Sequence, residues 1–153
     1  MDEVLTRLEA IEWVYGDHDP VALAELSRRI AAVGRTRQDF LNYSELVDGI
    51  AFRLSNVTAG EPYEIREWTN LDRNIIGSFL GRIVLDSHRR GRFFASALVI
   101  GKASNSPGEG FWGLAEDVGL LRSNSEAARL RLWVEHVELA RAWHRANPNL
   151  EYA

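Results

Sequence analysis

The sequence predicts a mainly helical α+β fold in which helices cover a small sheet of about three strands. Two apolar stripes with a period of 3.6 residues, within 72–90 and 125–145, predict the two longest helices. An apolar run at 93–100 predicts a strand that is buried on both faces. A helix followed directly by a strand and a loop also makes a winged-helix-like centre one arrangement of this unit.

Length and composition predict a single domain over residues 1–153. With 46% hydrophobic and 26% charged residues, the chain resembles globular proteins that bury a core and not disordered ones. Within the domain we expect an N-terminal αα-hairpin at 1–34, a central α/β unit at 43–121 and a C-terminal helix at 125–146.

The N-terminal part is predicted to contain two helices joined by a short turn. The first spans residues 2–15, where apolar residues recur at helical spacing: Val4, Leu8, Ile11 and Tyr15. Asp19 is a favourable N-cap for the second, Pro20 suits its first position, and Gly34 ends it. We expect the two helices to pack against each other.

The region between the helices is predicted to supply the rest of the sheet. Residues 35–42 are polar and are interpreted as a linker, and 43–47 as a short helix. Residues 50–54 alternate between apolar and polar side chains, as in a half-exposed strand, and 63–68 suggest a second strand. These two strands, paired as a hairpin, would join the buried run at 93–100.

The central unit has marked boundaries. Thr69 or Asn70 can cap the long helix, Asp72 places a carboxylate in its first turn, and Gly91 follows its basic end. Its apolar stripe consists of Ile75, Ile76, Phe79, Leu80, Ile83 and Val84. A loop at 102–110 and a short helix at 111–118 follow the predicted strand.

Three runs carry a resemblance to a known group of proteins: Leu-Gly-Arg-Ile at 80–83, Ala-Ser-Ala-Leu-Val-Ile at 95–100 and Pro-Gly-Glu-Gly-Phe at 107–111. In order and spacing they resemble a segment of uncharacterised bacterial proteins, some of them encoded beside or fused to HNH-type or restriction-type nucleases. The resemblance covers about a third of the chain. It implies a bacterial DNA-handling or defence context. No HNH nuclease core is present, so it does not imply nuclease activity.

Positive charge is concentrated in one segment of an acidic chain. The net charge is -4, yet residues 72–102 carry six cations against Asp72 and Asp86. Nearly all cations are arginines, which make forked contacts with phosphate. The candidate nucleic-acid-binding residues are Arg82, His88, Arg89, Arg90, Arg92 and Lys102. The alternative is that the arginines reflect only the codon use of a GC-rich genome.

No residue pattern predicts a catalytic, metal or cofactor site. The chain lacks Cys, and His136 and His144 are eight residues apart, a rise of about 12 Å along a helix. Ser87 and His88 are neighbours on a helix and point about 100° apart, which prevents a local relay. The glycine-rich loop at 107–110 lacks the Lys-Ser/Thr of phosphate-binding loops. A small enzyme with a site that the sequence does not reveal stays an alternative.

Tryptophan suggests a second kind of partner. Trp13, Trp68 and Trp112 have no clear place on the predicted apolar faces, so they are candidates for a contact with another protein or a second copy; the alternative is that they fill the core. Apolar runs are too short to span a membrane, and we expect a cytoplasmic protein. The predicted function is a non-catalytic binding module for nucleic acid or, alternatively, for a protein.

Overall fold

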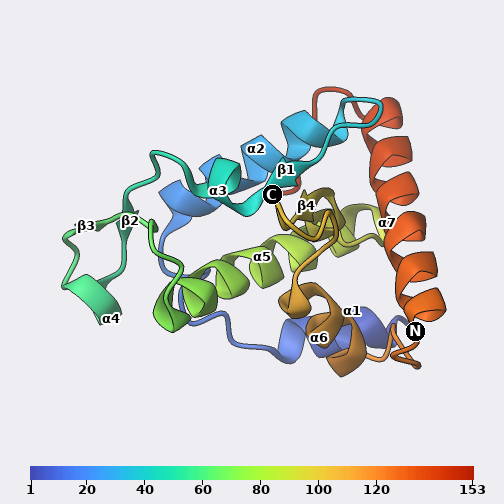
Figure 1. The fold of residues 1–153 in the computed structure, drawn as a ribbon, viewed down its shortest axis with the longest axis horizontal. Coiled ribbons are helices and arrows are strands. Elements are labelled where there is room, and N and C mark those ends of the chain that lie inside the picture. Colours follow the sequence, from blue (N-terminus) through green and yellow to red (C-terminus); the bar gives the residue numbers. More distant parts are fainter.

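The computed structural model describes residues 1–153, and the long helix α5 (Asn70–Gly91) lies at its centre (Figure 1). The predicted mainly helical α+β class is confirmed. The other helices are α1 (Glu3–Ala10), α2 (Pro20–Gly34), α3 (Tyr43–Val47), α4 (Ser55–Thr58), α6 (Glu109–Asp117), α7 (Glu126–Ala146) and the 3-10 helix η1 (Ala95–Leu98). The strands are β1 (Leu41–Asn42), β2 (Phe52–Arg53), β3 (Pro62–Tyr63) and β4 (Val99–Ile100).

Helix α5 begins where the sequence predicted. The Thr69 side chain accepts a hydrogen bond from the Asp72 amide, and the Asp72 carboxylate accepts one from the Thr69 amide, which forms a capping box. Arg92 ends the helix in the left-handed conformation, with φ 57°, and its amide donates to the carbonyl of His88. The predicted stripe is buried, apart from the half-buried Leu80, and most of it joins the larger of two core clusters.

Helices α1 and α2 lie on opposite sides of α5, so the predicted αα-hairpin is wrong (Figure 1). Helix α1 ends at Ala10, and its buried Leu8 belongs to the smaller core cluster, whereas Leu26 of α2 belongs to the larger one. The connecting segment runs along α5, where the amides of Tyr15 and Gly16 each donate to Ser78 Oγ at 3.0 Å. Each apolar stripe therefore packs against the central helix instead of its sequence neighbour.

The apolar run at 93–100 is buried as predicted, but most of it is not a strand. It forms η1 and then the two-residue strand β4. Ser87 of α5 explains the difference, because its hydroxyl donates to the Phe93 carbonyl at 2.7 Å and accepts from the Ala95 amide at 3.0 Å. Backbone groups that a sheet would pair are thus satisfied by a helix side chain.

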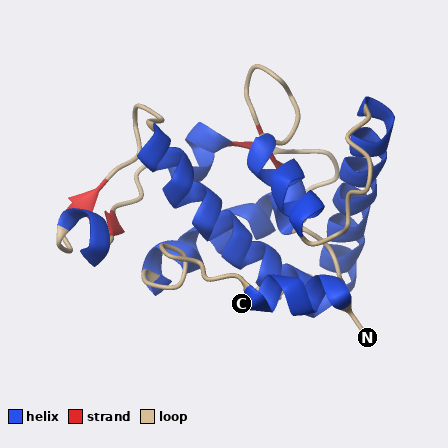
Figure 2. Cartoon of the chain, turned by 90° about the horizontal axis from the view of Figure 1, so that it is seen from below, coloured by secondary structure: helices blue, strands red, loops and turns tan.

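The strands form two separate pairs and not one sheet of three. Strand β4 pairs in parallel with β1, inside a segment that the sequence suggested was a linker. Strands β2 and β3 pair antiparallel, with Phe52 opposite Tyr63, which is the predicted hairpin in a shorter form. This hairpin and α4 project from one end of the molecule (Figure 2). A winged-helix-like centre is not confirmed, since a 3-10 helix follows α5.

Helix α7 covers one side of the core and places two neutral histidines inside it. Nδ1 of His136 accepts the Phe94 amide at 2.9 Å, and Nε2 of His144 lies 2.7 Å from the Tyr152 hydroxyl. Both side chains are buried. Burial lowers the pKa of His136 to about 4, helped by nearby His88, and it lowers the pKa of His144 to about 4, helped by Arg35 and Arg141.

These two histidines are expected to make the protein less stable as the pH falls from 7 to 5. Their ordinary pKa is 6.5, so between about 6.5 and 4 the unfolded chain binds protons that the folded chain does not. Each histidine should lower the free energy of unfolding by about 1 to 2 kcal/mol at pH 5. Urea titrations at several pH values measure this.

A matched pair of variants isolates the effect. His136→Asn keeps an acceptor for the Phe94 amide, and its free energy of unfolding should fall less steeply as the pH is lowered. His18→Asn, at an exposed turn, should leave the dependence of the free energy of unfolding on pH as it is in the unsubstituted protein. A free energy of unfolding that stays level from pH 7 to pH 5 contradicts the assignment of two buried neutral imidazoles.

Candidate ligand-binding pocket

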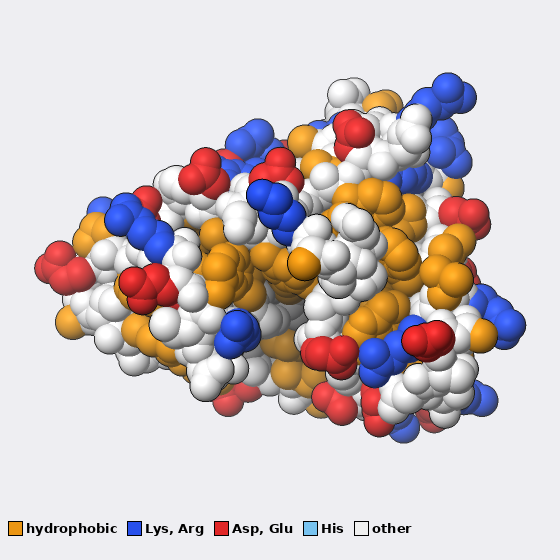
Figure 3. All heavy atoms as spheres, viewed as in Figure 1, with side chains coloured by type: hydrophobic (Ala, Val, Ile, Leu, Met, Phe, Trp, Pro, Cys, Tyr) orange, Lys and Arg blue, Asp and Glu red, His pale blue; other side chains and the backbone are white.

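A pocket of about 910 Å³ lies between α5 and α6. Figure 3, drawn from the same side as Figure 1, shows apolar side chains exposed around a hollow near the middle of the visible face. The volume falls within the range of roughly 300 to 1,000 Å³ that small-molecule sites occupy. The apolar lining includes Trp13, Trp68, Ile76, Leu80, Phe111 and Leu114.

Glycines at helical positions keep the pocket wide. Gly77 of α5 and Gly110 and Gly113 of α6 line it, and a Cβ atom built at any of the three would meet nothing within 4 Å. Inside a helix, glycine is less stable than alanine by about 1 kcal/mol. No neighbour requires a glycine here. What the three positions share is that they are exposed and border the pocket, where a side chain would take up open space.

Trp13 forms one wall of the pocket by packing on a fourth glycine. A Cβ atom at Gly81 would lie 2.1 Å from Cζ3 of Trp13, so the ring rests directly on the backbone of α5. Only 8% of Trp13 is exposed, and its Nε1 is buried without a hydrogen-bond partner. The residue thus fastens the segment that follows α1 to the central helix.

The polar groups of the lining are few. The Tyr43 hydroxyl accepts the Gly108 amide at 2.8 Å, and burial raises the pKa of Tyr43, so this hydroxyl keeps its own proton at neutral pH. Gly108 is the N-cap of α6 and has no side chain to bond the first amides of that helix. Ser96 is 6% exposed and lines the pocket, and its hydroxyl makes no hydrogen bond within the protein.

The pocket lining includes three charged residues. Arg73, in the first turn of α5, donates to Asn70 at 3.3 Å and has no carboxylate within ion-pair distance. Asp117 is the last residue of α6, about 12 Å along the helix from its start. Glu109 also lies at the lining, but its carboxylate is 3.4 Å from Arg129 and its side chain is 86% exposed. Arg73 is therefore the one cation of the lining, and neither it nor Asp117 forms an ion pair within the chain.

The runs that carry the bacterial resemblance meet at this pocket. Leu80 and Gly81 come from the first run, Ser96 from the second and residues 108–111 from the third, and all of them line the same volume. Segments separated by up to about thirty positions in the chain are thus brought together around one hollow.

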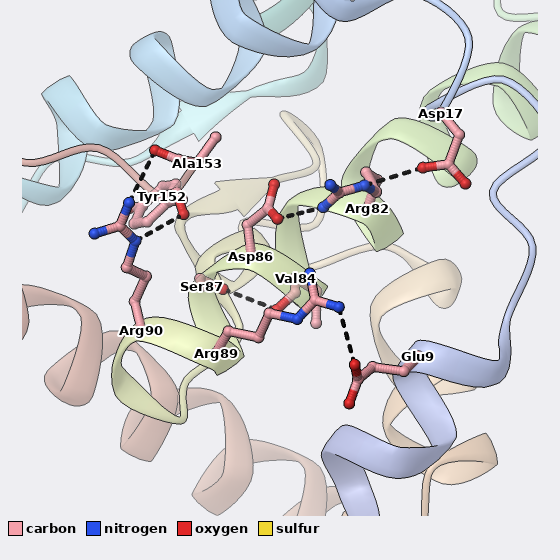
Figure 4. Close-up of polar contacts among 10 residues, drawn as sticks. All are labelled: Glu9, Asp17, Arg82, Val84, Asp86, Ser87, Arg89, Arg90, Tyr152 and Ala153. Carbon is pink, nitrogen blue, oxygen red and sulfur yellow. Dashed lines mark hydrogen bonds and ion pairs between the residues drawn. The ribbon is translucent and has the colours of Figure 1, made fainter.

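Three arginines predicted to contact nucleic acid are bound within the chain (Figure 4). Arg82 pairs with Asp17 at 3.0 Å and also with Asp86. Arg89 pairs with Glu9 at 3.0 Å. Arg90 donates to two backbone carbonyls near the C-terminus, those of Tyr152 at 3.2 Å and Ala153 at 3.0 Å.

The remaining candidates divide between the interior and the surface. His88 is buried and lies 2.8 Å from the Asp2 carboxylate. The Arg92 side chain is 82% exposed and 4.0 Å from Asp2, and Lys102 is exposed in the loop after β4. Nucleic-acid binding stays a prediction, and the cations free to serve it are Arg92 and Lys102.

The three tryptophans proposed as an interface do not form an exposed surface. Trp13 and Trp112 are buried in the smaller core cluster, and Trp68 is half-buried with its ring 6.1 Å from that of Tyr43. Trp112 packs edge-on against Phe111 at 4.8 Å. Two of the three therefore fill the core, and two of them, Trp13 and Trp68, are walls of the pocket.

Sequence reasoning did not find the pocket or the roles of Tyr43, Arg73 and Ser96. One signal was available, because Gly77 and Gly113 interrupt helical patterns at positions where alanine is more stable. The meeting of Ser96 with the start of α6 has no local signature, since it depends on how α5, η1 and α6 pack.

Comparisons with protein-family models, with curated proteins and with solved structures gave no match. No group of three or more His, Asp or Glu side chains is placed to hold a metal ion. None of the helices combines the length and the apolar character needed to cross a membrane.

Proposed function

We propose that the protein is a non-catalytic binding module that holds a small, mainly apolar molecule between α5 and α6. The observation that carries this proposal is the set of pocket-lining glycines at Gly77, Gly110 and Gly113, where a side chain would meet only open space. A helix that has no ligand to accommodate is stabilised by alanine at such positions. The pocket volume of about 910 Å³ supports the same reading.

The alternatives have less support from the geometry. Of the cations predicted to contact nucleic acid, Arg82 and Arg89 are paired with carboxylates of the same chain. A binding role in a bacterial DNA-handling or defence context remains what the resemblance implies, and a small-molecule module is compatible with that context. Binding to a partner protein has lost the support of the two buried tryptophans, Trp13 and Trp112.

The test is a fluorescence titration with N-phenyl-1-naphthylamine, a neutral probe that brightens in apolar surroundings. The parent protein should show saturable enhancement. Gly77→Leu should weaken binding by about tenfold or more, because the new side chain occupies volume that the probe needs.

The matched control is Asn74→Leu, one turn earlier on α5 at an exposed position outside the pocket lining. It adds the same apolar side chain and should leave binding within about twofold of the parent. Absence of saturable enhancement in the parent, or equal affinity in the two leucine variants, would show that the pocket does not bind the probe.

A further inference from the structure

Hydrogen-bond donors without acceptors gather at one end of the pocket. Helix α6 has nine residues, Glu109–Asp117, and its N-cap is Gly108, which leaves the first amides of the helix without a side-chain cap. The Tyr43 hydroxyl lies 2.8 Å from the Gly108 nitrogen, and since it accepts that amide, its own proton is free to be donated. The positive end of the helix dipole and a phenol therefore face the same part of the hollow.

Ser96 is an independent sign of a polar ligand atom. It lies on η1, on a different segment from Tyr43 and α6, and it is 6% exposed. Its hydroxyl makes no hydrogen bond within the protein, and because Ser96 lines the pocket, a polar ligand atom there would supply the missing partner. The rings of Phe94 and Phe111, 6.1 Å apart, bring the segment before Ser96 against the first turn of α6.

Arg73 adds a cation to this end. The contact of Tyr43 with Trp68, at 6.1 Å between ring centroids, brings the residue just before α5 beside the start of α6. Arg73 lies in the first turn of α5 and has no carboxylate partner. Glu109, an acidic residue of the lining, accepts a hydrogen bond from Arg129 at 3.4 Å and so does not occupy the free amides.

The other end of the pocket is apolar. From Arg73 to Gly81 the wall of α5 extends about 12 Å, past Gly77 and Leu80, and it finishes at the Trp13 ring. The Asp117 carboxylate belongs to the last residue of α6, at the opposite end of that helix from Gly108, where it would repel an anion. An elongated ligand thus has one orientation that satisfies both ends.

We propose that the ligand is an apolar carboxylic acid, bound as the carboxylate by the start of α6, Tyr43 and Ser96 with Arg73 at the rim, and with its hydrocarbon body along Gly77 and Leu80. This inference rests on the proposed function and names the chemical class of its ligand. Bonds from several fixed donors to a charged oxygen are the interactions that distinguish an acid from its neutral analogue.

The test compares decanoate with 1-decanol as competitors that displace N-phenyl-1-naphthylamine. Without anion recognition the alcohol binds more tightly, because a carboxylate loses more hydration on entering an apolar pocket. We expect decanoate to displace the probe at a concentration at least about tenfold lower than decanol does.

Variants then locate the carboxylate. Ser96→Ala and Arg73→Gln should each weaken the binding of decanoate by about tenfold and the binding of decanol by less than about twofold. Ser27→Ala, at a buried serine outside the pocket, should change the affinity for neither ligand. Because Arg73 is exposed, its variant is expected to fold even if that of Ser96 does not.

The possible failures are distinguishable. If the probe itself does not bind the parent, the proposed function fails. The inference is overturned if the probe binds but decanol competes as well as decanoate. It is also overturned if Arg73→Gln and Ser96→Ala leave the ratio of the affinities for decanoate and decanol unchanged. In either case the pocket binds apolar molecules without recognising an acid.

Discussion

Ser87→Ala is expected to lower the free energy of unfolding by about 2 to 4 kcal/mol. The Ser87 hydroxyl is fully buried, donates to the Phe93 carbonyl at 2.7 Å and accepts from the Ala95 amide at 3.0 Å. Alanine would leave both backbone groups without partners in a region where water cannot replace them. Chemical denaturation monitored by circular dichroism measures the change.

Ser27→Ala supplies the control for this prediction. Ser27 is also buried, at 1% exposed, but its hydroxyl has no hydrogen-bond partner, and it lies inside α2. Alanine removes an unsatisfied polar group and has a higher helix propensity, so stability should rise by about 1 kcal/mol. Equal effects of the two substitutions would contradict the role assigned to Ser87.

Gly81→Ala is expected to destabilise the protein by about 2 to 4 kcal/mol, although alanine is normally the better helix residue. The new methyl group would lie 2.1 Å from Cζ3 of Trp13 and 2.4 Å from Cη2. The backbone of α5 is held on both sides, so the indole must move and the buried wall of the pocket is lost. Near-ultraviolet circular dichroism and Trp fluorescence should report the movement of the ring, and urea titration the stability.

Gly77→Ala, four residues earlier on the same helix, should have the opposite effect on stability. Its methyl group would meet nothing within 4 Å, so the gain in helix propensity is not offset, and stability should rise by about 1 kcal/mol. If both alanine variants stabilise the protein, Trp13 does not rest on Gly81 as described. If both destabilise it, Gly77 has a structural role that the open space around it does not reveal.

The helices were the most predictable part of this fold. Thr69 and Asp72 supply a capping box that acts within four residues of chain, and the apolar stripe from Ile75 to Val84 has the helical period. Asp19 and Pro20 likewise started α2 where predicted. These signals are local, because the groups that satisfy the first amides of a helix lie next to it in sequence.

The segment at 93–100 shows where local signals end. Its apolar character correctly predicted burial, since residues 93–99 are buried, but burial alone does not distinguish a strand from a 3-10 helix. The conformation depends on the Ser87 hydroxyl, which bonds to the backbone on both sides of Phe94. That contact depends on where α5 lies relative to the segment, which the sequence of the segment does not reveal.

The candidate site was hidden for a related reason. The arginines between 82 and 92 are visible in the sequence as a basic cluster, yet Arg82 and Arg89 meet Asp17 and Glu9, from more than sixty positions away. Charge counted along the chain does not reveal such pairs. Tyr43 and Gly108 are also distant in sequence, and their contact at 2.8 Å depends on tertiary packing.

By itself, the sequence determined the long helices α2, α5 and α7, the N-caps of α2 and α5 and which faces are apolar, because these follow from period, propensity and hydrogen bonds between near neighbours. Only the tertiary structure decided that α1 and α2 lie on opposite sides of α5, that the arginines are largely neutralised and that glycines from two helices border one hollow. Those features depend on which surfaces meet. An apolar stripe determines that a face will be buried but not against which partner, since apolar burial is non-directional.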